Sequence, residues 1–72
     1  MTIPGKMSIR LNGKPREVSR GLSVSGLLQE LELHPAMVVV ELNRDILERA
    51  SYDDAPVSEG DTIELVHFVG GG

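Results

Sequence analysis

The chain has 72 residues, of which 40% are hydrophobic and 25% charged, and its formal net charge is -4. A chain this short forms one small domain, and a cleft large enough for substrate, cofactor and catalytic groups would consume most of its core, so we expect no enzymatic activity of its own. The absence of cysteine excludes disulfides, thiolate zinc sites and cysteine nucleophiles, and is consistent with the cytoplasm. The chain is basic through Arg20 and acidic from Gly21 onward, which favours a basic protein partner over nucleic acid. The longest apolar run, residues 36–40, is far shorter than the roughly 20 residues of a membrane span, so we expect no membrane insertion.

The chain begins with a predicted disordered leader, residues 1–6, followed by a β-hairpin. Residues 7–11 alternate apolar and polar side chains, which is typical of a half-buried strand. Asn12-Gly13 predicts a two-residue turn because both residues tolerate positive φ. The second strand continues to Val18, and Pro15 places it at an edge of the sheet, since proline cannot donate to a neighbouring strand.

The middle of the chain predicts one helix and a central strand. Ser23 is a candidate helix N-cap. Apolar residues follow at the spacing of one helix face: Val24, Leu27, Leu28 and Leu31. Pro35 is expected to stop the helix. Residues 37–42 are apolar on both faces apart from Glu41, which indicates a strand covered by the helix on one side and by something else, such as a partner, on the other.

The last third predicts a short strand over 46–48, a loop around Tyr52, a turn at 58–61 and a final strand over 62–69. We expect a single folded domain, 7–69, followed by a flexible glycine tail, 70–72. Consecutive glycines lack a Cβ near the terminal carboxylate, so the tail can thread a narrow channel. In isolation, such a tail is also consistent with a frayed, functionless terminus.

The predicted element order is that of the β-grasp, or ubiquitin-like, fold. The sequence resembles the thiamine-biosynthesis sulfur carrier family, which has that fold and ends in a diglycine. The resemblance is carried by residues 11–13, 22–31, 38–43 and 59–72. The last stretch is the most specific, because it joins a Gly-Asp turn, an apolar strand and the terminal glycines. The implied fold class is α+β, with a mixed sheet of four to five strands packed on one helix.

The resemblance also implies a chemistry. A partner adenylating enzyme of the E1 type transfers AMP from ATP to the carboxylate of Gly72, and a sulfur donor protein converts the adenylate to a thiocarboxylate. Thiazole synthase then uses that sulfur to build the thiazole ring of thiamine. Gly70 and Gly71 are the flexible arm. We expect this chain to bind no cofactor, since it lacks a phosphate-binding loop and ATP belongs to the partner.

A docking surface is expected near the tail. Phe68 and Val66 have the parity opposite to Ile63 and Leu65, which are assigned to the core, so they are predicted to contact the partner; packing of Phe68 on the sheet rim is the alternative. We assign the outward face of the central strand to Val38 and Val40, which completes the predicted partner-binding set.

Two alternative functions share these features. The small subunit of molybdopterin synthase shares the fold and the diglycine, and a protein-interaction module with an inert tail has the same elements. No metal site is predicted, because His34 and His67 lie on no common element and the carboxylates lack metal-ligand spacing.

Overall fold

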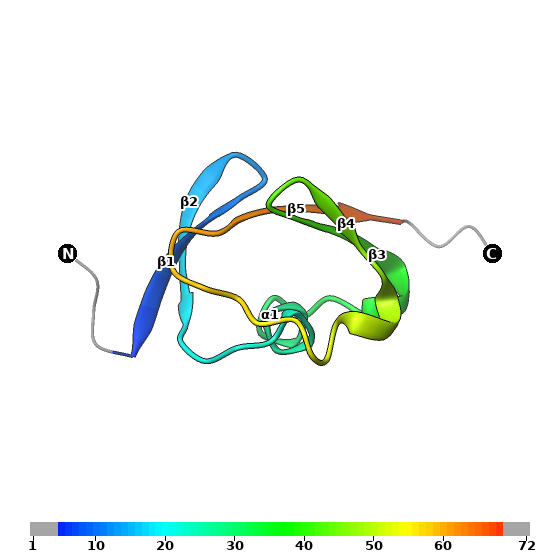
Figure 1. Ribbon diagram of the computed structural model, residues 1–72, viewed down its shortest axis with the longest axis horizontal. Helices are drawn as coiled ribbons and strands as arrows, with labels where there is room; N and C mark the ends of the chain where they lie inside the picture. Colours follow the sequence, from blue (N-terminus) through cyan, green and yellow to red (C-terminus); the bar gives the residue numbers. More distant parts are fainter. Residues whose placement is uncertain (1–4, 69–72) are drawn as a thin grey trace.

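The computed structural model describes residues 5–68 as a five-stranded mixed sheet with one α-helix on one face (Figure 1). The strand order is β2-β1-β5-β3-β4, and β1 runs parallel to β5 while the other pairs are antiparallel. The elements in chain order are β1 Lys6–Leu11, β2 Lys14–Ser19, α1 Val24–Glu30, the 3-10 helix η1 Pro35–Met37, β3 Val38–Leu42, β4 Asp45–Leu47, the 3-10 helix η2 Arg49–Ser51 and β5 Thr62–His67. The predicted α+β class is confirmed. In residues 5–68, no helix has the length and apolar character to cross a membrane.

Two tight hairpins, β1–β2 and β3–β4, lie on either side of β5. The first turns at Asn12 and Gly13, with φ of 49° and 82°, as the sequence predicts. The second turns at Asn43 and Arg44, with φ of 50° and 75°. Both therefore have positive φ at two successive residues, which matches the twist of the flanking strands. The second turn has no glycine, and the strand after it begins at Asp45, one residue before the predicted position.

Helix α1 begins as predicted but ends earlier. The Ser23 side chain accepts a hydrogen bond from the backbone N–H of Gly26 at 3.1 Å, which confirms the N-cap. The helix ends at Glu30, because Glu32 adopts a φ of 61° and the N–H of Leu33 bonds back into the last turn. Pro35 lies beyond this end and opens η1 instead.

The core lies between α1 and the inner face of the sheet. Its buried members are Met7, Ile9, Val18, Val24, Leu27, Leu28, Val38, Val40, Tyr52, Val57 and Ile63. Tyr52 follows η2 and is only 3% exposed, and its hydroxyl donates a hydrogen bond of 2.9 Å to the carbonyl of Val38. The sequence placed Tyr52 in a loop and did not identify it as a core residue. Because its buried hydroxyl has a hydrogen-bond partner, the ring stabilises the core through its apolar surface without leaving an unsatisfied polar group.

Glu30 ties the end of α1 to the end of β2. Its carboxylate accepts hydrogen bonds from the Ser19 hydroxyl at 2.6 Å and from the Ser19 backbone N–H at 3.2 Å. These bonds, the hydroxyl bond first, hold the pKa of Glu30 below its ordinary value of 4.5, and the positive charges of Lys6 and Arg16 act in the same direction. The ionised form of Glu30 is therefore favoured by folding.

This contact predicts a pH-dependent effect of Glu30→Gln. Because the pKa is lower in the folded state, the contribution of Glu30 to stability is fully present above pH 4.5, the ordinary pKa of the group. It disappears as the pH falls through the folded-state pKa. At pH 7 we expect the variant to be less stable than the wild type, and the difference to shrink under acid conditions. Urea unfolding between pH 7 and 3 measures this. Glu48→Gln is the control, since the Glu48 side chain makes no capping bond to η2; a difference for Glu30→Gln that does not change with pH would contradict the account.

Candidate functional site

Strand β5 occupies the centre of the sheet, and asparagines from both hairpin turns hold it. On one side, the Oδ1 atom of Asn12 accepts a hydrogen bond of 2.7 Å from the Leu65 N–H. On the other side, the Oδ1 atom of Asn43 accepts one of 2.9 Å from the Thr62 N–H. The two turns thus position the strand that leads to the glycine tail.

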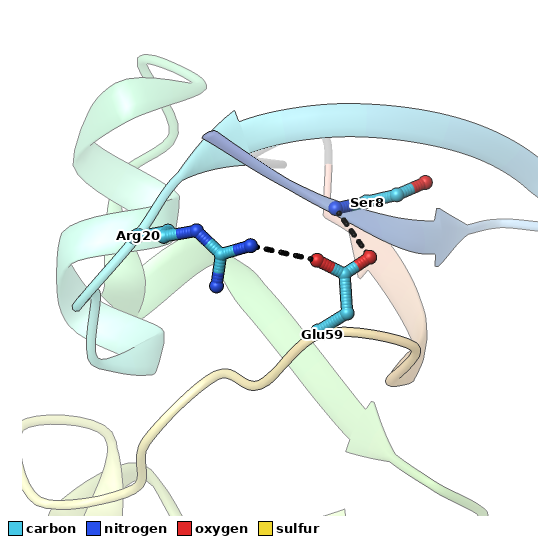
Figure 2. A network of polar contacts seen from close by, with 3 residues as sticks. All are labelled: Ser8, Arg20 and Glu59. Carbon is cyan, nitrogen blue, oxygen red and sulfur yellow. Dashed lines mark hydrogen bonds and ion pairs between the residues drawn. The ribbon is translucent and has the colours of Figure 1, made fainter. Parts of the chain in front are cut away.

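The turn before β5 is fastened to β1 by Glu59. Its carboxylate accepts hydrogen bonds from the Ser8 backbone N–H at 3.1 Å and from the Arg20 guanidinium at 3.3 Å (Figure 2). Gly60, which has a φ of 85°, donates its N–H to the Ser8 carbonyl at 2.8 Å. Asp61 closes the same turn by accepting a bond from the Ser58 N–H at 2.7 Å, as its position in the predicted turn suggests. The start of β5 is therefore fixed against β1.

The end of β5 projects at one end of the sheet (Figure 1). Its pairing with β3 continues one residue beyond the strand, where the Phe68 N–H donates to the Met37 carbonyl at 2.8 Å. Gly70, Gly71 and Gly72 lie outside the described residues, so their assignment as arm and sulfur acceptor stays a prediction. The described domain fixes the chain up to four residues before Gly72.

An apolar patch lies on the outer face of the sheet, opposite α1. Three of its side chains are well exposed: Ile46 at 74%, Val66 at 56% and Phe68 at 46%. Val39 is half-buried and pairs with Val66 across β3 and β5. These four residues form what we call the outer-face patch. The exposure of Phe68 and Val66 agrees with the predicted parity, while their contact with a partner remains a prediction.

Two acidic side chains adjoin the outer-face patch. Glu41 on β3 pairs with Ile46 on one side and with Glu64 on the other. Sequence reasoning missed Ile46, although its parity follows from the Asn43–Arg44 turn once that turn is known. The patch is therefore apolar with an acidic margin, which complements an apolar partner surface with basic residues beside it.

The assignment of Val38 and Val40 to the outward face is wrong. Both are fully buried and lie opposite His67 and Leu65 of β5, on the face that carries Ile63 and turns toward α1. The outward valine of β3 is Val39. Residues 38–40 are all valine, so the sequence alone contains no alternation from which to choose the buried face.

The described domain shows neither a pocket nor a cluster of three potential metal ligands within residues 5–68. His34 instead caps η1, where its Nδ1 atom accepts a hydrogen bond of 3.1 Å from the Ala36 N–H. What the described residues offer is an exposed apolar surface and a fixed strand end.

A helix packed on a mixed five-stranded sheet, with the last strand at the centre, defines a small β-grasp domain. Comparison with protein-family models gives a match to the ThiS family over residues 9–72. The chain therefore belongs to the ThiS family of sulfur carrier proteins, which are not enzymes. This confirms the family predicted from the sequence.

Individual relatives agree with this assignment. The chain is 35% identical over 65 residues to the sulfur carrier protein ThiS of Bacillus subtilis, covering 89% of this chain and 98% of the relative. The crystal structure of the thiamine biosynthesis protein ThiS from Geobacter metallireducens superposes with a TM-score of 0.79 at 40% identity, covering 92% of this chain and all of that one. These relatives confirm the β-grasp fold and favour the thiamine carrier over the molybdopterin synthase subunit.

A second kind of relative is larger. The chain is 42% identical over 66 residues to a thiazole synthase of Magnetococcus marinus, and the match covers 92% of this chain but only 20% of that protein. A thiazole synthase of Paramagnetospirillum magneticum matches at 39% identity, again over 20% of its length. The chain thus spans about a fifth of the thiazole synthases that it matches.

The assignment of faces predicts opposite outcomes for two valine substitutions. Val40→Ala removes two buried methyl groups and should lower the free energy of unfolding by about 2 kcal/mol. Val66→Ala acts on an exposed side chain and should change it by less than about 0.5 kcal/mol. Urea unfolding of the two variants measures this. Equal losses, or a larger loss for Val66→Ala, would contradict the assigned faces.

Proposed function

We propose that this protein carries sulfur as a thiocarboxylate on Gly72 and delivers it for thiazole formation in the cytoplasm. The observation that carries the proposal is that the ThiS family match extends through residue 72, so it includes the terminal glycines as well as the domain. The fixed end of β5 supports it, because a rigid domain can present a short arm from a defined point.

The proposed reaction needs two displacements. In the first, a carboxylate oxygen of Gly72 attacks the α-phosphorus of ATP bound by an E1-type adenylating enzyme, and pyrophosphate leaves. In the second, a sulfur donor protein supplies sulfur at the oxidation level of hydrosulfide, which attacks the acyl carbon while AMP leaves. Adenylation is required because it turns a poor leaving oxygen into a good one. The carrier supplies the carboxylate and the surface, and both enzymes supply the chemistry.

Thiazole synthase is the proposed acceptor of the sulfur. Support comes from the two relatives that are named thiazole synthase, since a region matching 92% of this chain occurs within those larger proteins. A domain that is covalently joined to an enzyme in some organisms is a good candidate to bind that enzyme in others. We propose that the outer-face patch provides this contact, with Phe68 and Val66 nearest the tail.

The length of the tail limits where the partner can bind. Four residues follow Phe68, and an extended chain spans at most about 3.5 Å per residue, so the Gly72 carboxylate lies within about 14 Å of Phe68. A partner whose active centre receives this carboxylate must therefore contact the domain close to the end of β5. The exposed side chains of Phe68 and Val66 are suited to that contact.

The proposal predicts a defined product in a reconstituted reaction. The protein is incubated with ATP, sulfide and the adenylating enzyme of the same organism, and its intact mass is measured. We expect the mass to increase by the exchange of one oxygen for sulfur, because only the terminal carboxylate is activated.

A variant lacking Gly72 is the control. It ends in Gly71 and keeps the described domain unchanged, and we expect no mass increase because its carboxylate lies one residue too far from the activated position. Sulfur incorporation at the same rate in this variant, or no incorporation in the wild type with an enzyme active on its own carrier, would refute the proposal.

A further inference from the structure

The backbone groups of β5 alternate between its two neighbours. Toward β3, the Phe68 N–H donates to Met37 and the Thr62 carbonyl accepts from Asn43. The backbone N–H and C=O groups of the even-numbered β5 residues therefore point toward β3, since hydrogen-bonding direction alternates along a strand. The backbone groups of the odd-numbered residues point toward β1.

The β1 side of β5 is only partly occupied. Strand β1 ends at Leu11 and pairs with β5 at Thr62 and Ile63 alone. Asn12 then extends the coverage, since its N–H donates to the Ile63 carbonyl at 2.9 Å and its side chain accepts from Leu65. Beyond this point, the Leu65 carbonyl and the His67 N–H face a position with no strand, and no hydrogen bond within residues 5–68 involves them. We call these two groups the open β5 edge.

Two comparable groups elsewhere in the sheet are satisfied by side chains. Beyond the end of β4, the Val38 carbonyl accepts hydrogen bonds from the Tyr52 hydroxyl and the Arg49 guanidinium. The outward N–H of Ser19 on edge strand β2 donates to Glu30. Proteins usually cover unpaired strand edges in this way, because exposed edges pair with other chains. The open β5 edge lacks such cover at the place where the chain leaves the domain.

We propose that an extended segment of thiazole synthase pairs with the open β5 edge and adds a strand beside β5. The partner N–H would donate to the Leu65 carbonyl, and a partner carbonyl would accept from the His67 N–H. This inference rests on the proposed function, which brings the chain end into the enzyme. The reach of about 14 Å from Phe68 to the carboxylate brings the enzyme close to the end of β5, where this edge lies.

The side chains beside the open β5 edge specify the segment further. Val66 and Phe68 are exposed on the outer face, so the added strand should present apolar side chains to that face. Glu64 lies on the same face and favours a basic residue on the partner. Main-chain pairing supplies affinity in such strand addition, and the alternate side chains supply selectivity.

Amide hydrogen exchange of the wild-type protein tests the pairing directly. With thiazole synthase of the same organism in excess, exchange at the His67 amide should slow by about tenfold or more, because the pairing would bury and bond it. The control amide is that of Glu17 on edge strand β2. Like the N–H of Ser19 two residues later, it points away from β1, and it should exchange at the same rate with and without the enzyme. Unchanged exchange at His67 in a complex that forms would overturn the pairing.

Proline substitution tests the same N–H by removing it. His67→Pro should weaken binding to thiazole synthase by about tenfold, since a hydrogen bond is lost and the ring obstructs close approach. Glu17→Pro is the matched control, because it places proline on the open edge of β2 with the parity of Pro15, and it should leave the affinity within about twofold of the wild type. His67→Ala keeps the backbone N–H and removes the imidazole, so it measures the contribution of that side chain to binding. Its effect should be smaller than that of His67→Pro.

The outcomes separate this inference from the proposed function. Binding of the wild type with equal affinities for His67→Pro and His67→Ala would overturn the strand pairing and leave sulfur transfer standing. Failure of the wild type to bind thiazole synthase would contradict both the partnership and the pairing. If His67→Pro does not fold, as judged by circular dichroism, the exchange measurement on the wild type decides alone.

Discussion

The structure depends on the insertion of the last strand, β5, between β1 and β3. This insertion joins two hairpins that would otherwise be separate, and it completes the inner face against which α1 packs. Asn12 and Asn43 serve twice, first as positive-φ turn residues and then as side-chain acceptors for β5. Because Ser8 and Glu59 bond across 51 residues, the position of β5 depends on the complete fold.

That arrangement divides the work of a carrier between two parts of one short chain. The folded part holds its polar groups in bonds of its own, such as those of Glu59 and Tyr52, and presents an apolar outer face. In the proposed reaction, the glycines that follow supply a carboxylate with no side chain to hinder it. In the function we propose, recognition belongs to the domain and reactivity to the tail.

Much of the fold follows from local sequence signals, whereas several details depend on contacts between distant residues. The turn at Asn12 and the cap at Ser23 have short-range causes, so the sequence reveals them. The burial of Tyr52 depends on its bond to Val38, which no local pattern encodes. The orientation of β3 could not be predicted because three successive valines satisfy either face. The role of Gly72 came from the family resemblance, since glycines at the end of an arbitrary short chain favour an inert tail, and only the predicted strand and fold order reverse that preference.

Growth of a bacterial strain that lacks its own ThiS sulfur carrier tests the central claim most directly. The strain is grown without thiamine while it expresses either this protein or the variant without Gly72, and both proteins are quantified in the cells. The account predicts that the full-length protein restores growth, that the variant does not, and that added thiazole alcohol rescues both cultures equally. Equal restoration by the variant, or no restoration by a well-expressed full-length protein in the organism of its origin, would contradict a carrier whose terminal glycine holds the sulfur.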